Sequence, residues 1–387
     1  MIGREIAAVI NKRAKKMPVI SITGPRQSGK TTLVRQIFPD YNYVSLENIV
    51  NRENAKLEPL DFLKRNGPNL IIDEVQYVPE LFSYIQVLVD ESGKMGEYIL
   101  TGSQHFLLME KVSQSLAGRV GIFNLLPFSM LELSGGGITF NNYRECIWKG
   151  FYPALYDRNM EPEEWLPEYV ETYVERDIRQ IINVSDLATF RSFMRLCAGH
   201  IGQLVNFSSI ANQIGVSYQT VKKWLSVLKT SFVIFTLQPH HVNFNKRLVK
   251  SPKLYFYDTG LACFLLGINK ASQLDNHYHK GALFENLMIA EIIKAYYNEG
   301  KRPSLFFWRD NSGNEIDLLI ESATQIKVVE FKSSKTIHPE FFKGLDYYGK
   351  LSGIDISQRF LIYGGDSDFK RPQGNVFSWK SDLKWAE

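Results

Sequence analysis

The segment that most constrains the fold is a glycine-rich loop that follows the apolar run Val19–Ile22. Its spacing fits the pattern G-x-x-x-x-G-K-[ST], in which backbone N–H groups curl around phosphates. That use of the pattern requires a strand before the loop and a helix after it, here from Thr31 to Phe38. The sequence therefore predicts an α/β phosphate-binding domain, and the alternative is a plain glycine turn. The loop residues are Gly24, Pro25, Arg26, Gln27, Ser28, Gly29, Lys30, Thr31 and Thr32.

Each loop position has an expected part in binding. Gly24 opens the loop and Gly29 allows a close approach of the backbone to the ligand. Lys30 reaches the β- and γ-phosphates, and the Thr31 hydroxyl ligates Mg²⁺. The expected ligand is therefore ATP, with Mg²⁺ as its cofactor.

A second apolar run, Leu70–Ile72, ends in the adjacent carboxylates Asp73 and Glu74. In a site of this kind Asp73 would hold Mg²⁺, directly or through water, and Glu74 would polarise the attacking water. The alternative is a buried strand that ends in a solvated acidic turn. Together with the loop, this pair predicts a nucleotide-hydrolysing site.

Two further segments offer polar groups to that site. The strand Tyr98–Thr101 leads to Ser103 and Gln104, which are candidates to sense the γ-phosphate, whereas Thr101 is expected to point back into the sheet. Arg119 precedes the apolar strand Ile122–Leu126. It is either a solvated surface arginine or a finger that stabilises transition-state charge from a neighbouring subunit, which implies an ATP-dependent homo-oligomer.

Length and composition favour a multidomain enzyme. The 387 residues suit two to four domains, and no run of 18 apolar residues predicts a membrane span. The N-terminal stretch is read as an amphipathic helix without a secretion signal. Cys146, Cys197 and Cys263 are odd in number and far apart, which favours a reducing compartment over disulfides or a zinc site. A cytoplasmic location is the expectation.

The net charge of +4 is unevenly distributed along the chain. Residues 191–253 carry nine Lys and Arg and no acid, whereas residues 140–190 carry five against ten. Such a basic stretch is an electrostatic footprint of nucleic-acid binding. The acidic segment before it, Glu161–Glu175, is expected to rest against the basic stretch and screen it.

The basic stretch has the pattern of a winged helix-turn-helix. Helices are predicted over 190–200, 208–214 and 217–228, with serine caps on the second and third and a turn at 215–216. In the third helix Val221, Trp224, Leu225 and Leu228 pack inward. The side chains left facing out, which would meet a DNA groove, are Tyr218, Gln219, Lys222 and Lys223.

The strands Phe232–Leu237 and Val242–Leu248 would form the wing. Lysines on an exposed helix also suit a protein-docking module, so both partners stay open, with DNA preferred. The residues expected over phosphates are Lys246, Arg247, Lys250 and Lys253.

A second candidate site lies in the last third. Strands are predicted over 305–308, 315–321 and 326–333, and a helix over 281–297. Asp317 interrupts an apolar strand, Glu330 and Lys332 share one face of the next, and Glu285 lies on an apolar row of the helix. These groups would hold Mg²⁺ for phosphodiester hydrolysis, with Asp317 and Glu330 as ligands, or they form buried salt bridges.

These motifs together resemble the AAA+-type ATPases of bacteria and archaea that carry an uncharacterised C-terminal domain. The matching segments are the loop from Gly24, Ile72–Gln76, Leu100–Ser103, Leu116–Arg119 and, more loosely, Lys253–Leu261 with Asn314–Asp317 and Glu330–Lys332. The resemblance implies Lys30, Thr31, Asp73 and Glu74 for ATP and Mg²⁺. It also implies a winged helix and a domain similar to PD-(D/E)XK nucleases, with Glu285, Asp317, Glu330 and Lys332 at its centre.

The resulting prediction divides the chain into four parts. They are a parallel-sheet ATPase domain (1–135), an acidic helical connector (136–190), a basic winged helix-turn-helix (191–250) and an α/β restriction-endonuclease-like domain (251–387). One hypothesis is an ATP-hydrolysing enzyme that acts on DNA and has a metal-dependent nuclease site. The other is a nucleotide-gated switch that binds DNA or protein and whose nuclease-like domain is inactive.

Overall fold

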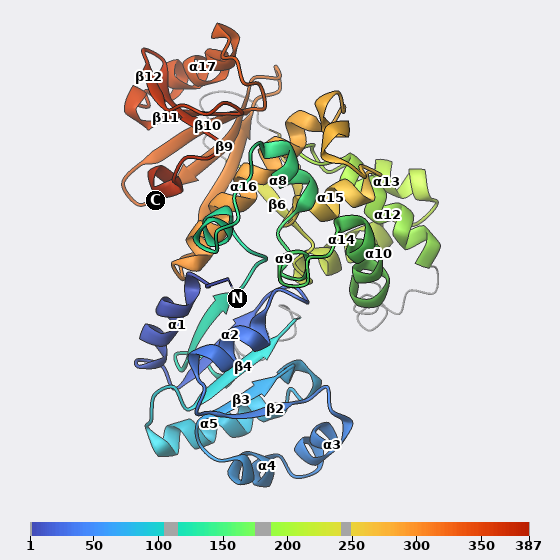
Figure 1. The fold of residues 1–387 in the computed structure, drawn as a ribbon, viewed down its shortest axis with the longest axis vertical. Helices are drawn as coiled ribbons and strands as arrows, with labels where there is room; N and C mark the ends of the chain where they lie inside the picture. The colour runs from blue at the N-terminus through green and yellow to red at the C-terminus, as the bar shows by residue number, and fades with distance from the viewer. Residues whose placement is uncertain (1, 104–114, 175–186, 241–248, 387) are drawn as a thin grey trace.

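The computed structural model describes residues 2–103, 115–174, 187–240 and 249–386. Figure 1 shows an elongated molecule with one sheet and its helices at one end, a second sheet at the other end, and a group of helices beside the second sheet. The N-terminus lies at the junction between the two ends. No helix among these residues is long and apolar enough to cross a bilayer.

The first sheet contains five parallel strands in the order β2-β3-β4-β1-β5. Strands buried on both faces read as apolar runs, and their side chains alternate between two cores. Val19 packs in one core with α3, α4 and α5, and Ile20 in the other with α1 and α2. The elements are α1 (Ile6–Ala14), β1 (Val19–Thr23), α2 (Lys30–Ile37), β2 (Asn42–Ser45), α3 (Ile49–Leu57), α4 (Pro59–Asn66), β3 (Leu70–Asp73), η1 (Val75–Tyr77), α5 (Leu81–Ser92), β4 (Tyr98–Gly102) and β5 (Val120–Asn124).

Helices dominate the middle of the chain. Helix α14, the third of the predicted helix-turn-helix, begins after Ser217, whose Oγ accepts the backbone N–H of Thr220 at 3.0 Å. The cap of α13 is Asn206 rather than the expected Ser208, because its amide oxygen accepts the N–H of Ser209 at 3.0 Å. The helices are α7 (Met130–Gly135), α8 (Tyr143–Lys149), α9 (Ala154–Asp157), α10 (Pro162–Tyr169), the π-helical η2 (Val170–Val174), α12 (Leu187–Gly199), α13 (Phe207–Ile214), α14 (Tyr218–Thr230), α15 (Thr259–Leu265) and η3 (Ala271–Asp275).

The strand after α14, β6 (Ile234–Pro239), pairs antiparallel with β7 (Lys253–Phe256). Residues 242–248, expected as the second strand of the wing, lie outside the described residues, and Lys246 and Arg247 lie there with them. Strand β6 also pairs in parallel with β8 of the C-terminal sheet. The first of the two strands expected in the wing is therefore part of a larger sheet, in which β7 is the edge strand.

That sheet has eight strands in the order β12-β13-β11-β10-β9-β8-β6-β7. Helix α16 packs on one face with Val329, and α17 on the other with Val328. Its remaining elements are α16 (Lys280–Asn298), β8 (Ser304–Arg309), β9 (Glu315–Glu321), β10 (Ile326–Lys332), η4 (Pro339–Phe342), α17 (Lys343–Ser352), η5 (Ile356–Gln358), β11 (Arg359–Tyr363), β12 (Phe369–Arg371), β13 (Gly374–Ser378) and η6 (Leu383–Ala386).

One hydrophobic core runs from Leu126 to Ala386 and includes side chains of the connector, of α12 to α14 and of the C-terminal sheet. These parts therefore bury apolar surface against one another. The free thiols of Cys146, Cys197 and Cys263 are all buried. Burial raises the pKa of each thiol, which suits packing rather than reactivity.

Candidate nucleotide site and carboxylate cluster

The predicted phosphate loop lies at the carboxyl edge of the first sheet, where ligands of open parallel sheets bind. Strand β4 lies between β1 and β3. The segment after β4 therefore lies between the loop that follows β1 and the acids that end β3. This strand order places Ser103 near both the phosphate loop and the paired acids. The position of Ser103 at the end of a strand suggested the same place.

The loop geometry depends on its glycines and on Lys30. A Cβ on Gly24 would collide with the carbonyl oxygen of Leu125, and Gly29 has a left-handed φ of 91°. Lys30 begins α2, and its Nζ donates to the carbonyl oxygens of Gly24 at 3.0 Å and Pro25 at 2.8 Å. The Oγ of Ser28 is buried and has no hydrogen-bond partner among the described residues. Donors that line the loop in this way suit phosphate oxygens.

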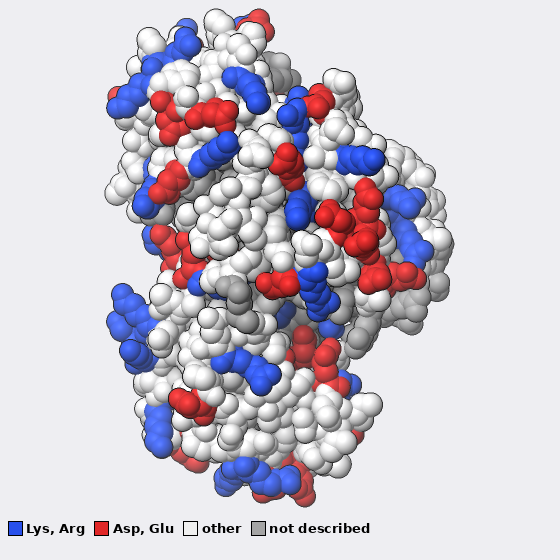
Figure 2. Space-filling view, in the orientation of Figure 1, with Lys and Arg blue, Asp and Glu red and all other residues white. Residues whose placement is uncertain are grey.

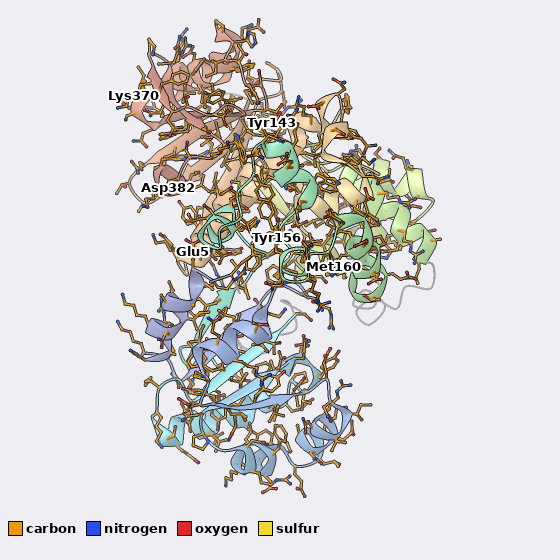
Figure 3. The ribbon with its side chains drawn as sticks, in the orientation of Figure 1. Glu5, Tyr143, Tyr156, Met160, Lys370 and Asp382 are labelled. Atoms are coloured by element: carbon orange, nitrogen blue, oxygen red, sulfur yellow. The ribbon has the colours of Figure 1, made fainter. Side chains whose placement is uncertain are left out.

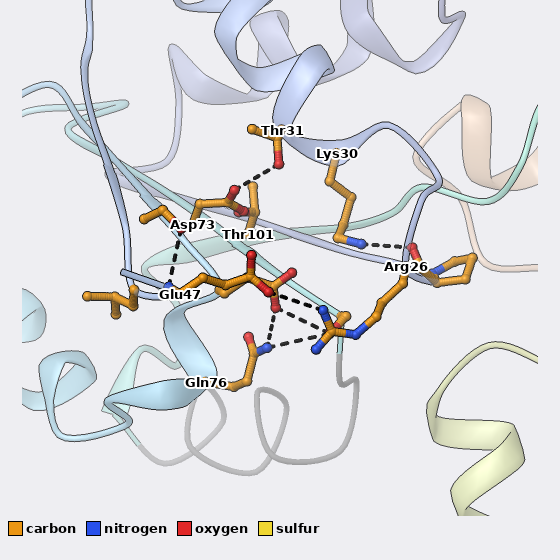
Figure 4. A network of polar contacts seen from close by, with 12 residues as sticks. Arg26, Lys30, Thr31, Glu47, Asp73, Gln76 and Thr101 are labelled. Carbon is orange, nitrogen blue, oxygen red and sulfur yellow. Dashed lines mark hydrogen bonds and ion pairs between the residues drawn. The ribbon is translucent and has the colours of Figure 1, made fainter. Parts of the chain in front are cut away.

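Asp73 accepts hydrogen bonds from three hydroxyl groups, and Figure 4 shows Thr31 and Thr101 beside it. The Oγ1 of Thr31 lies 2.8 Å from its Oδ2, the hydroxyl of Tyr43 lies 2.7 Å from the same oxygen, and Thr101 donates to Oδ1. The expectation that Thr101 points back into the sheet was therefore wrong, because β3 and β4 are neighbours and its hydroxyl meets the carboxylate at the strand ends. The oxygens of Thr31 and Asp73 are together, as Mg²⁺ ligation would require.

Glu74 follows Asp73 in a left-handed conformation with φ 55°. Such a backbone costs about 1–3 kcal/mol for a residue other than glycine, and outliers of this kind gather at functional sites. Its carboxylate accepts hydrogen bonds from the amide of Gln76 and from the Oγ of Ser103, the latter at 3.2 Å. The strained backbone thus directs the carboxylate into the site. The other candidate sensor, Gln104, lies outside the described residues.

A cavity of about 370 Å³ is lined by the loop, by Asp73 and Glu74, and also by residues that no motif indicated, among them Arg4 and Arg158. Arg26 is buried, and one of its guanidinium nitrogens lies 3.3 Å from Glu47 in the segment after β2. Arg4 approaches from the N-terminal segment, and the exposed Arg158 follows α9 of the connector. Arg26 belongs to the loop, whereas Arg4 and Arg158 come from other parts of the chain and are brought to the loop only by the tertiary structure.

Arg119 does not lie with the loop. It directly precedes β5, at the amino end of the parallel sheet, and binds Asp90 of α5 through two nitrogens, at 2.5 and 2.8 Å. This hydrogen-bonded pair raises the pKa of Arg119 and lowers that of Asp90. Within one chain Arg119 therefore lies away from the loop in a partly exposed ion pair. A role across subunits stays a prediction.

The expected DNA-binding face is exposed on α14. Val221, Trp224, Leu225 and Leu228 are buried, as the helical spacing predicted. The exposed positions are Tyr218, Gln219, Lys222 and Lys223. Lys253 was expected over phosphates, but it is only 2% exposed, because β7 turns it toward α16.

The acidic connector lies beside part of the basic segment. Figure 2 shows acidic side chains gathered over α10 next to basic side chains over α12. Glu171 lies 3.8 Å from Arg191 of α12 in an exposed ion pair. The described contact is therefore with α12, and the lysines of α14 keep their exposure.

The second candidate site does assemble around the residues predicted for it. Lys332 Nζ lies 2.6 Å from Glu330 and 3.5 Å from Asp317, on neighbouring strands. Lys253 Nζ lies 3.4 Å from Glu285 of α16 and also contacts Glu315 of β9. Lys253 and Glu315 were not predicted for this site, because neither stands in a motif spaced like acid-x-lysine.

Burial dominates the electrostatics of this cluster. It raises the pKa of Glu285 to about 7, although Lys253 opposes the shift. The pKa of Glu330 is raised well above its usual value by burial and by Asp317, to which it is hydrogen-bonded. Asp317 has a lowered pKa, because Lys332, Lys253 and hydrogen bonds outweigh its burial. These shifts favour the charged form of Asp317 over that of Glu330.

The expected convergence of Glu285, Asp317 and Glu330 on one metal ion is not what the structure shows. Among the described residues, no group of three or more His, Cys, Asp or Glu side chains is arranged to hold a metal. The physical reason is that the ammonium groups of the buried Lys253 and the half-buried Lys332 contact these carboxylates.

Residues 16–134 match a family model described as an AAA domain. Two domains of unknown function, DUF8612 and DUF4143, match residues 140–272 and 280–381. An uncharacterized protein of Mycobacterium tuberculosis is 29% identical over 370 residues, which cover 95% of this chain and 81% of the relative. An uncharacterized protein of Haemophilus influenzae is 25% identical over 343 residues, which cover 80% of this chain and 81% of the relative. The first match supports a P-loop α/β domain of the AAA type.

Two solved structures are similar in part. A Walker-type ATPase of Pyrococcus abyssi has a TM-score of 0.43 and 14% identity, and covers 67% of this chain and 94% of its own. AMPPCP-bound DnaA from Aquifex aeolicus has a TM-score of 0.26 and 15% identity, and the match covers 57% of this chain and 86% of the DnaA chain. Both TM-scores are low, so neither structure assigns a role to a residue here.

Proposed function

We propose that the chain binds and hydrolyses ATP. The observation that carries this proposal is the arrangement of Thr31, Asp73 and Glu74 beside a phosphate loop at the carboxyl edge of a parallel sheet. Mg²⁺ would be held by Thr31 and Asp73, and when bound it would neutralise phosphate charge. The match of residues 16–134 to an AAA domain supports the same function.

Several residues would each have a separate role in ATP binding and hydrolysis. Lys30 and the N–H groups of the loop bind and orient the phosphates. Glu74, which Ser103 and Gln76 hold in place, accepts a proton from the attacking water. Arg26, Arg4 and Arg158 line the same cavity and supply positive charge near the phosphates. The site therefore carries a base and several cations within one chain.

Replacing the loop lysine tests nucleotide binding. We expect Lys30→Ala to abolish ATP binding, because the ammonium group that reaches the β- and γ-phosphates is removed. Titration of the full chain with a fluorescent ATP analogue measures this. Lys64→Ala, at an exposed lysine of α4, is the matched control and should bind as wild type. Unchanged binding by Lys30→Ala would refute the loop assignment.

We further propose that nucleotide binding controls DNA binding by α14. Buried contacts connect the ATP cavity to the rest of the chain, since Arg4 lines the cavity and lies 3.1 Å from Glu132 of α7. The N–H of Met130 in turn donates to Glu291 of α16 at 2.7 Å. Figure 3 places Glu5 at this junction, where it accepts a hydrogen bond from Asn298 at 3.0 Å. A change in the cavity therefore has a packed route to the C-terminal part.

The lysines of α14 test the choice of partner. We expect Lys222→Ala with Lys223→Ala to flatten the slope of log K against log salt for duplex DNA by about 1.8, because each lysine on a phosphate contributes about 0.9. Fluorescence anisotropy at several salt concentrations, with and without ATP, measures it. The exposed pair Lys15 and Lys16, changed to Ala, is the control. Wild-type affinity that does not respond to salt would favour protein docking instead.

For the C-terminal domain, the salt-bridged carboxylates favour the hypothesis of an inactive nuclease-like domain. Each predicted metal ligand already has a buried lysine or a hydrogen-bond donor as partner. Incubation of the chain with Mg²⁺ or Mn²⁺ and several DNA forms should therefore show phosphate release from ATP without strand scission. Scission that Asp317→Asn removes would restore the nuclease hypothesis.

A further inference from the structure

Lys253 is the least exposed cation of the carboxylate cluster. It lies on β7, at the edge of the eight-stranded sheet, and its side chain is 3% exposed. Its ammonium group lies 3.4 Å from Glu285 and contacts Glu315. The charge of Asp317 also acts on it and raises its pKa, together with the charges of those two acids, against the effect of burial. Three carboxylates from α16 and β9 thus act on one ammonium group.

Other donors also contact these acids. The hydroxyl of Tyr255, two residues along β7, donates to Glu285. The backbone N–H of Phe331 donates to Asp317 at 2.9 Å, and Arg309 lies 3.1 Å from Glu315. These half-buried carboxylates therefore already have donors within the chain as partners. A divalent ion would have to displace these donors and lie beside an ammonium charge.

We propose that the ammonium group of Lys253 is the resident cation of this cluster and balances the charge that a divalent ion balances in a metal-dependent nuclease. Hard divalent ions need several oxygen ligands of their own. Here the oxygens of Glu285 and Glu315 face Lys253 instead. The cluster therefore holds the edge hairpin of the sheet to α16 and β9 without metal. This proposal does not depend on ATP hydrolysis.

The test is thermal unfolding of the nucleotide-free full chain in EDTA and in millimolar Mn²⁺. The wild type should unfold at the same temperature in both, because Lys253 fills the site. Lys253→Ala should lower Tm by roughly 5–10 °C in EDTA, since the half-buried carboxylates lose the buried ammonium group that pairs with them. In Mn²⁺ this variant should recover roughly 3–5 °C, because the vacated space and unpaired oxygens admit a cation.

Lys294→Ala is the matched control. Lys294 is also a buried lysine, but it pairs with Glu291 alone among the described acids and sits over the ring of Phe151. Its removal should lower Tm as well, and Mn²⁺ should restore nothing. A recovery in Mn²⁺ limited to Lys253→Ala therefore identifies the cluster rather than general destabilisation.

Two outcomes would overturn the proposal. One is a wild-type Tm that rises in Mn²⁺ and loses that rise in Asp317→Asn, which would show a metal site beside Lys253. The other is a Lys253→Ala variant that Mn²⁺ does not stabilise. If Lys253→Ala does not fold, the electron paramagnetic resonance of Mn²⁺ with the wild type decides, because binding that Asp317→Asn removes contradicts the proposal and its absence supports it.

Discussion

Glu74→Gln is expected to bind ATP as wild type and to hydrolyse it about 10²–10⁴-fold more slowly. The amide keeps the size and the hydrogen bonds to Gln76 and Ser103, but it cannot accept a proton from water, and general bases contribute about this factor. Phosphate release under saturating ATP, together with an equilibrium titration of a nucleotide analogue, separates turnover from binding.

The control for this variant is Glu80→Gln. Glu80 is an exposed acid in the same domain that precedes α5 and does not line the cavity. It should hydrolyse ATP as wild type does. Turnover at the wild-type rate by Glu74→Gln would show that another group activates the water, and it would remove the reason given for the left-handed backbone at this position.

Lys294→Met is expected to lower the free energy of unfolding by about 3–5 kcal/mol, the cost of removing one partner from a buried pair. Lys294 is 1% exposed, and its Nζ lies 2.6 Å from Glu291 and 2.9 Å from the carbonyl oxygen of Phe128. The variant leaves a carboxylate and a carbonyl without their donor. Urea unfolding followed by tryptophan fluorescence measures the change.

Lys301→Met provides the comparison, because Lys301 pairs with Glu299 at the surface near the end of the same helix. An exposed pair contributes about 0–1 kcal/mol, so this variant should be nearly neutral. Since Phe128 also lines the ATP cavity, Lys294→Met should weaken ATP binding as well. If Lys294→Met and Lys301→Met had equal free energies of unfolding, the buried pair of Lys294 and Glu291 would not stabilise the chain as predicted.

The elements that are periodic in sequence were predictable. The helices α14 and α16 and the strands β8 to β10 lie within about two residues of the predicted ranges, because their apolar spacing matches the face that they bury. The burial of Trp224 and Leu228 followed from the same pattern. The boundaries of the predicted domains stay predictions, since the connector, the helices and the second sheet share one core.

The wing was harder to predict, because local sequence does not say which strand a strand will pair with. Strand β6 joins both β7 and β8, and its pairing with β8 connects segments about 70 residues apart. The same pairings turn Lys253 away from solvent. The positive charge of Lys253 suggested a contact with phosphate. The carboxylates that pair with it lie far away in the sequence, so the sequence alone did not indicate them.

The sequence by itself determined the phosphate loop, the paired acids Asp73 and Glu74, and the inward acids of the C-terminal part. Its local spacing was enough, because a loop, a strand end or a helix face is fixed by neighbours along the chain. Only the tertiary structure decided that Thr101 faces Asp73 and that Arg119 lies at the amino ends of the strands, opposite the phosphate loop. It also decided that Lys253 neutralises the carboxylate cluster. These outcomes depend on which strands become neighbours and on the burial of charges, and both arise from contacts between residues far apart in the sequence.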